Sequence, residues 1–176
     1  SQDKETHMAN TTFSGPIRSE STIKTISKNA TTGTITEVTT LGGAPVSLSD
    51  GNVTLTNATH SGRILLVPDG GQDNTYTLPA PIAGSVFRFV YAGGAADGTD
   101  AIIVTPGNTN FYIGNITFHD QDGNAISAVF PDGNSESSFQ INVPQAFDVT
   151  IVGKDTTNYQ IFGSVTSTTA PAFADQ

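Results

Sequence analysis

From residue 46 onward, the sequence is a series of short apolar stretches separated by clusters of Gly, Pro, Asp and Asn. Apolar and polar residues alternate in most of them, as in Phe139–Val143 and Phe147–Ile151. This period of two is typical of a β-strand with one buried face. The composition favours the same structure, because 26 threonines and 18 glycines leave few strong helix formers. We therefore expect an all-β domain, and within that class an antiparallel β-sandwich of the jelly-roll type.

The alternation also predicts where the strands lie. Residues 46–55 are expected to form a hairpin around the turn Ser49–Asn52. The strongest strand signal is Val86–Tyr91, which a glycine-rich loop follows. Further strands are expected at residues 64–67, 76–78, 102–104, 111–118, 139–143, 147–152 and 159–162.

The chain divides into four parts by sequence character. Residues 1–7 have the character of a vector-derived remnant that precedes Met8, the only methionine. Residues 8–45 carry few apolar residues and no sustained period, so they form either a loosely packed extension of the domain or an extended N-terminal arm that becomes ordered on a partner surface. Residues 46–165 are the predicted β-sandwich. Residues 166–176 are expected to be a flexible C-terminal tail.

Charge separates the N-terminal segment from the rest. Residues 8–49 hold three basic and two acidic residues, a net charge of +1, whereas residues 50–176 hold three basic and twelve acidic residues, a net charge of -9. An acidic domain of this kind is not expected to bind nucleic acid, which needs a dense basic face. No apolar run approaches the roughly 20 residues that cross a bilayer, so no membrane partner is expected either.

Residues with catalytic or metal-binding chemistry are few. With no cysteine, the chain has no disulfide, no thiolate zinc site and no cysteine nucleophile. His60 and His119 are best explained as structural residues at strand ends. The Asp120-x-Asp122-Gly123-Asn124 turn has oxygen ligands suited to calcium, but its spacing departs from the calcium loop and such residues also form turns without a metal. We expect no enzymatic activity and no cofactor, and whether this turn binds an ion stays open.

Several short motifs occur in a characteristic order. The first is Met-Ala-Asn-Thr-Thr-Phe-Ser-Gly-Pro-Ile-Arg-Ser at residues 8–19, and the second is residues 53–56 followed by His60-Ser61-Gly62-Arg63. A Thr-Leu-Pro, Gly, Phe-x-Phe arrangement follows at residues 77–89, and the last motif is residues 148–163. In this order the motifs resemble a family of small virion structural proteins of tailed bacteriophages, especially those that infect marine bacteria. The resemblance implies that residues 148–163 form the closing hairpin of the fold.

The resemblance implies a non-enzymatic virion protein, specifically a knob-like capsid decoration protein on the outside of the head. Its partner would be the phage major capsid protein, and it would form a homo-oligomer, with a trimer favoured. The alternative is a tail-fibre or receptor-binding domain that contacts host surface glycans, although the chain has no Trp for sugar stacking. The segment around residues 130–138 departs from the family pattern, so an extra loop there is expected to face a partner. The residues expected to dock the arm are Phe13, Pro16, Ile17, Arg18, Ile23 and Ile26.

Overall fold

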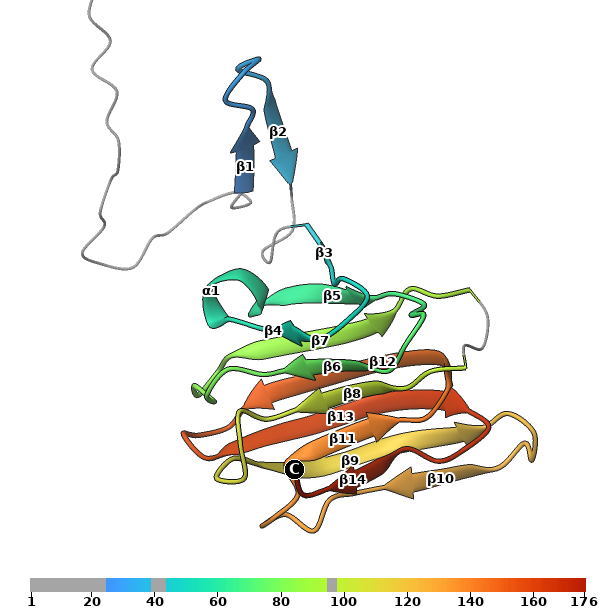
Figure 1. Cartoon of the computed structure of the whole chain (residues 1–176). Helices are drawn as coiled ribbons and strands as arrows, with labels where there is room; N and C mark the ends of the chain where they lie inside the picture. The colour runs from blue at the N-terminus through green and yellow to red at the C-terminus, as the bar shows by residue number, and fades with distance from the viewer. Residues whose placement is uncertain (1–24, 39–43, 95–97) are drawn as a thin grey trace, which may run out of the picture. The chain divides into compact units, whose positions relative to one another are not determined.

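The computed structural model describes residues 25–38, 44–94 and 98–176. Its contacts divide the chain into two compact units, Ser1–Leu41 and Gly42–Gln176. The described residues of both units are built from β-strands, and the one helix among them is the short α1 (Asn57–His60) (Figure 1). The all-β prediction is therefore confirmed. None of the helical residues described forms a segment long and apolar enough to span a membrane.

The described part of the first unit is an antiparallel hairpin of β1 (Thr25–Lys28) and β2 (Ile35–Val38). Asn29 closes its turn, because the side-chain Oδ1 accepts hydrogen bonds from the backbone N–H groups of Thr31 and Thr32 at 2.8 and 3.0 Å. Gly33 ends the turn with a φ of 71°, a conformation that favours glycine. The predicted N-terminal arm thus contains a local hairpin.

The second unit consists of two mixed sheets (Figure 1). The seven-stranded sheet has the order β10-β9-β13-β12-β7-β5-β3, and the five-stranded sheet has the order β14-β11-β8-β6-β4. The strands are β3 (Val46–Ser47), β4 (Val53–Thr54), β5 (Arg63–Val67), β6 (Asn74–Thr77), β7 (Val86–Tyr91), β8 (Ala101–Val104), β9 (Phe111–Asp120), β10 (Ile126–Val129), β11 (Ser138–Ile141), β12 (Pro144–Gly153), β13 (Asn158–Ser167) and β14 (Ala172–Ala174).

In the first half of this unit, successive strands alternate between the two sheets. β3, β5 and β7 lie in the larger sheet, while β4, β6 and β8 lie in the smaller one. Each return crosses to the other sheet, so neighbours within a sheet run parallel. The predicted hairpin at residues 46–55 is therefore wrong: its turn carries the chain from β3 to β4, which belong to different sheets and pair with β5 and β6.

The second half closes the larger sheet with long strands. β12 and β13 form the antiparallel hairpin expected at residues 148–163, and β13 then pairs in parallel with all ten residues of β9. Of the ten strand pairings described in this unit, five are parallel and five antiparallel. The predicted antiparallel jelly-roll arrangement is thus not confirmed. Alternation marks which side of a strand is buried, but it is the same for parallel and antiparallel neighbours.

The hydrophobic core lies between the two sheets. Tyr76 of the smaller sheet contacts Phe89 of the larger one, with ring centroids 6.2 Å apart. The hydroxyl of Tyr112 crosses the core and donates to the carbonyl of Ile103 at 3.0 Å. The remaining fully buried large side chains include Phe87, Phe139, Leu55, Leu65, Leu78, Ile116, Ile141 and Tyr159.

The C-terminal residues belong to the fold, in contrast to the expected flexible tail. β13 extends to Ser167, and β14 pairs with β11 at the edge of the smaller sheet. Phe173 stacks on Phe139 with ring centroids 4.7 Å apart. The amide of Gln176 donates to the carbonyl of Thr105 at 2.9 Å. The sequence did not predict this, because a three-residue strand with one aromatic residue is too short to show a period of two.

Candidate functional site

Five of the six residues predicted to dock the N-terminal arm lie outside the part of the chain that the structure describes. These five are Phe13, Pro16, Ile17, Arg18 and Ile23. Ile26 lies in β1, where its backbone is opposite Glu37 of β2. The arm prediction therefore stays a prediction, and the candidate site must be sought on the second unit.

His60 and His119 lie on different elements of the second unit. His60 ends α1, and its Nδ1 lies 2.9 Å from the backbone N–H of Thr56, which donates to it. His119 lies on β9 opposite Ile126 of β10. Asp120 accepts backbone hydrogen bonds from Asp122 and Gly123 at 3.0 and 3.1 Å, so its carboxylate stabilises its own turn. In the described parts of the chain, no group of three or more His, Asp or Glu side chains could hold a metal ion.

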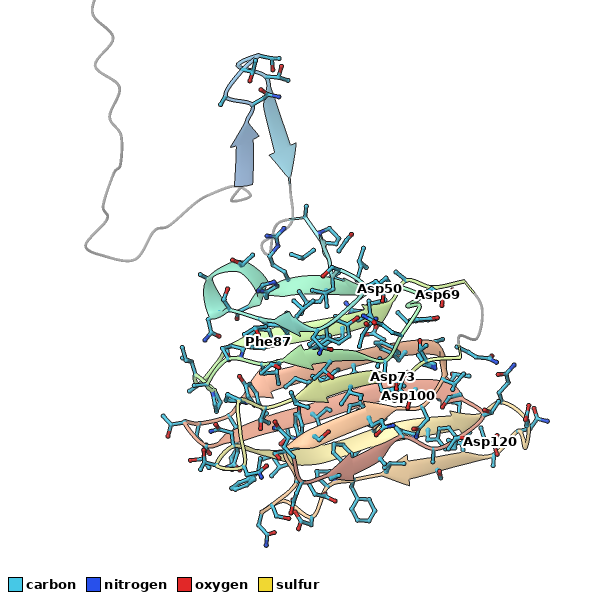
Figure 2. The ribbon with its side chains drawn as sticks, in the orientation of Figure 1. Asp50, Asp69, Asp73, Phe87, Asp100 and Asp120 are labelled. Atoms are coloured by element: carbon cyan, nitrogen blue, oxygen red, sulfur yellow. The ribbon has the colours of Figure 1, made fainter. Side chains whose placement is uncertain are left out.

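Aspartates gather where β3, β5, β7 and β9 end, and Figure 2 shows five of them at this end of the unit: Asp50, Asp69, Asp73, Asp100 and Asp120. Four of them, Asp50, Asp69, Asp73 and Asp100, form hydrogen bonds between neighbouring loops and strand ends. Asp100 accepts from the backbone N–H of Val143 at 3.0 Å and from the amide of Gln140 at 2.6 Å. Asp73 in turn accepts from the backbone N–H of Asp100 at 2.8 Å. The hollow beneath these loops is about 10 Å³, room for a single water molecule.

The outer face of the seven-stranded sheet is the more informative surface. Register aligns one residue from each of five neighbouring strands across it. These residues, called the outer row below, are Ile64, Arg88, Thr150, Phe162 and Asn115 of β5, β7, β12, β13 and β9. Their sequence neighbours Leu65, Phe87, Phe89, Ile151 and Ile161 are buried between the sheets, so the outer row points away from the core.

Large apolar side chains are exposed along this face. Ile64 is 36% exposed and Phe162 is 47% exposed. Ile126, on the edge strand β10, is 70% exposed and is opposite the outward-facing His119. Phe130, also 70% exposed, directly follows β10, and continuing the β9–β10 register by one residue places it opposite Asn115, at the end of the outer row.

The acidic and basic side chains of this face are Asp148 and Arg88, which form an ion pair with each other. Arg88 Nε donates to Asp148 Oδ1 at 2.9 Å, and Arg88 Nη2 donates to Asp148 Oδ2 at 2.5 Å. The hydrogen bond from Arg88 holds the pKa of Asp148 below its ordinary value, and Asp148 raises the pKa of Arg88. The outward positions of these described strands contain no other Asp, Glu, Lys or Arg. The face is therefore electrically neutral on a strongly acidic unit.

The centre of the outer row is slightly hollowed. Arg88, Asp148, Thr150, Phe162 and Ser164 line an open depression of about 370 Å³ together with Gly163. Gly163 has a φ of 145°, and a Cβ there would lie 2.1 Å from the carbonyl oxygen of Asp148. Glycine is therefore required where β12 and β13 meet beneath the depression.

In comparisons with known proteins, no family model and no curated protein matches this chain. The outer row was not found from the sequence, because its members are dispersed over almost one hundred residues and only strand register aligns them. The local signals were Arg88, the single charged residue within the strand Val86–Tyr91, and Phe162, an aromatic at an outward position.

Proposed function

We propose that this protein is a non-enzymatic structural component of a bacteriophage virion, which decorates the outside of the capsid. The observation that carries the proposal is the neutral and partly apolar outer face of the seven-stranded sheet. A surface of this kind is suited to contact with another protein, because association buries apolar side chains and leaves no charge unpaired. The motifs that resemble phage virion proteins point to the virion as its location.

The division of the chain supports the same function. The N-terminal unit is compact by itself and includes the predicted docking residues, while the second unit has its own closed core. Residues 50–176 carry a net charge of -9, so an acidic capsid surface would repel them. Residues 8–49 carry a net charge of +1 and would not be repelled. We infer that the N-terminal segment attaches to the major capsid protein and that the second unit is displayed.

Electron microscopy of purified virions, labelled with an antibody to this chain, tests the location. Label distributed over the head is the expected result. Label confined to the tail would contradict capsid decoration and favour the alternative of a tail-fibre domain that binds host glycans.

Deletion of residues 9–41 tests the role of the N-terminal segment. The shortened chain should retain the circular dichroism spectrum of a β-protein and should no longer bind capsids that lack the protein. Full occupancy of capsids by a folded, shortened chain would show that the attachment lies elsewhere.

A further inference from the structure

We propose that the outer face of the seven-stranded sheet is the contact between two copies of this chain, packed face to face about a two-fold axis. This inference concerns how a virion protein of the proposed kind would self-associate, and to that extent it rests on the proposed function; it replaces the trimer that the resemblance favours with a two-fold pair. The occupant of the face is a second copy, and three features of the described residues support it.

The first feature is the placement of exposed apolar side chains. In the described residues, five large hydrophobic side chains are exposed, and four of them lie on or beside this face: Ile64, Ile126, Phe130 and Phe162. The fifth, Ile82, lies in the loop between β6 and β7. The five-stranded sheet contributes none of them: its outward side chains include Thr75, Thr77, Ser138 and Gln140, and the outward Ile102 and Val104 are half-buried and largely buried. Contact with water is therefore more costly at the outer face of the seven-stranded sheet.

The second feature is the edge strand β10. Edge strands of monomeric proteins are usually protected by Lys, Pro or a covering segment. β10 has the sequence Ile-Ser-Ala-Val, with no charge and no proline, and its residues are exposed apart from the half-buried Val129. An apolar, unprotected edge next to the outer row extends the apolar surface that a partner would cover. Phe130 also lies in the segment that departs from the phage family pattern.

The third feature is electrostatic and favours a second copy over a basic partner. Two copies of the chain, each with a net charge of -9, repel one another wherever their carboxylates meet. The outer face avoids this repulsion, because its one carboxylate, Asp148, is paired with Arg88. A patch with one positive and one negative centre is also complementary to itself when the two-fold axis passes between the two charges and across the line that joins them, because Arg88 of one copy then lies towards Asp148 of the other. A basic partner would instead be attracted to the aspartate-rich end.

Sedimentation equilibrium of the full chain between about 1 and 100 μM tests the proposal. We expect the mass of two 18.3 kDa chains, or an even multiple of it. Phe162→Lys and Ile126→Lys should each weaken association at least tenfold, because each places a charge in the apolar contact. Both substitutions make the chain less acidic, so a general charge effect would strengthen association. Ile82→Lys is the matched control, and it should leave the mass unchanged.

Charge exchange provides a second, independent measurement. Arg88→Asp and Asp148→Arg should each weaken association, and the double exchange should restore it. Circular dichroism identifies any variant that fails to fold. A monomer over the whole concentration range would overturn the proposal, as would a mass of three chains, or equal dissociation by Ile82→Lys. None of these outcomes depends on where the antibody labels the virion, so failure here and failure of capsid decoration are distinguishable.

Discussion

Arg88 and Asp148 are sixty residues apart in the sequence and form a bidentate ion pair between β7 and β12. Thr150, not Asp148, is directly opposite Arg88, so the pair is diagonal across the two strands. The guanidinium fork matches both carboxylate oxygens, which fixes the orientation of both side chains. This contact makes the outer face neutral and preserves its apolar character.

The substitution Asp148→Asn should lower the free energy of unfolding only slightly. Both side chains are nearly half exposed, and exposed ion pairs contribute about 0.2–1 kcal/mol. The pKa of Asp148 is lower in the folded state, so its contribution is present above the ordinary carboxyl pKa and is lost as the pH falls below about 4. Urea unfolding at pH 7 and pH 3 should show a difference between wild type and variant at pH 7 that diminishes at pH 3. An equal or larger difference at pH 3 would contradict this.

Gly163→Ala should destabilise the second unit by more than about 2 kcal/mol, because the new Cβ meets the backbone of β12 and the residue has a positive φ. Gly94→Ala is the matched control, since a Cβ there has no atom within 4 Å. The control should remain within about 0.5 kcal/mol of wild type in the same urea titration. Similar stability of the two variants would show that β12 and β13 are not held this closely.

Two buried tyrosines should respond differently to loss of their hydroxyl groups. The hydroxyl of Tyr159 donates to the carbonyl of Pro79 at 2.8 Å, so Tyr159→Phe should cost about 1–2 kcal/mol. The hydroxyl of Tyr76 has no hydrogen-bond partner in the described residues, so Tyr76→Phe should be neutral or slightly stabilising. Thermal unfolding of the two variants measures this contrast, and equal losses would contradict it.

The environment of Tyr76 also predicts its titration. Burial raises the pKa of its hydroxyl to about 12. The nearby Asn74 side chain partly offsets this rise in pKa. Asn74 forms no well-aligned hydrogen bond with the Tyr76 hydroxyl, and its Oδ1 accepts from the backbone N–H of Gly51 at 2.6 Å. Absorbance at 295 nm should therefore show less tyrosine ionisation near pH 10 in wild type than four ordinary tyrosines would give, and Tyr76→Phe should remove part of the late phase.

Phe173→Ala should destabilise the second unit by about 2–3 kcal/mol, less than a fully buried Phe because Phe173 is only partly buried. Phe173 contacts both Phe139 and Tyr112, at ring-centroid distances of 4.7 and 5.9 Å. Ala172→Ser, at an exposed position of the same strand, is the control and should change little. A negligible effect of Phe173→Ala on urea unfolding would support the flexible tail that the sequence predicts.

Much of the local structure could be predicted from the sequence because burial on one side of a strand is a local property. Alternation located the strands near residues 86–91, 147–152 and 159–162. The β12–β13 hairpin was also expected, because the resemblance to phage virion proteins implies a closing hairpin at residues 148–163. The candidate site was not predicted, because Arg88 and Phe162 become neighbours on one face only when β7, β12 and β13 are aligned.

The sequence by itself determined the all-β class, the positions of most strands and the acidic character of residues 50–176. Only the tertiary structure decided that β3 and β4 belong to different sheets, that β9 and β13 run parallel and that Phe173 completes the core. The physical reason is that strand formation depends on the periodicity of nearby side chains, whereas the choice of strand partners depends on how distant segments pack their buried faces together and on the turns that connect them. The backbone hydrogen bonds that then join the partners use the same groups whatever the residue, so no single stretch of sequence records its partner.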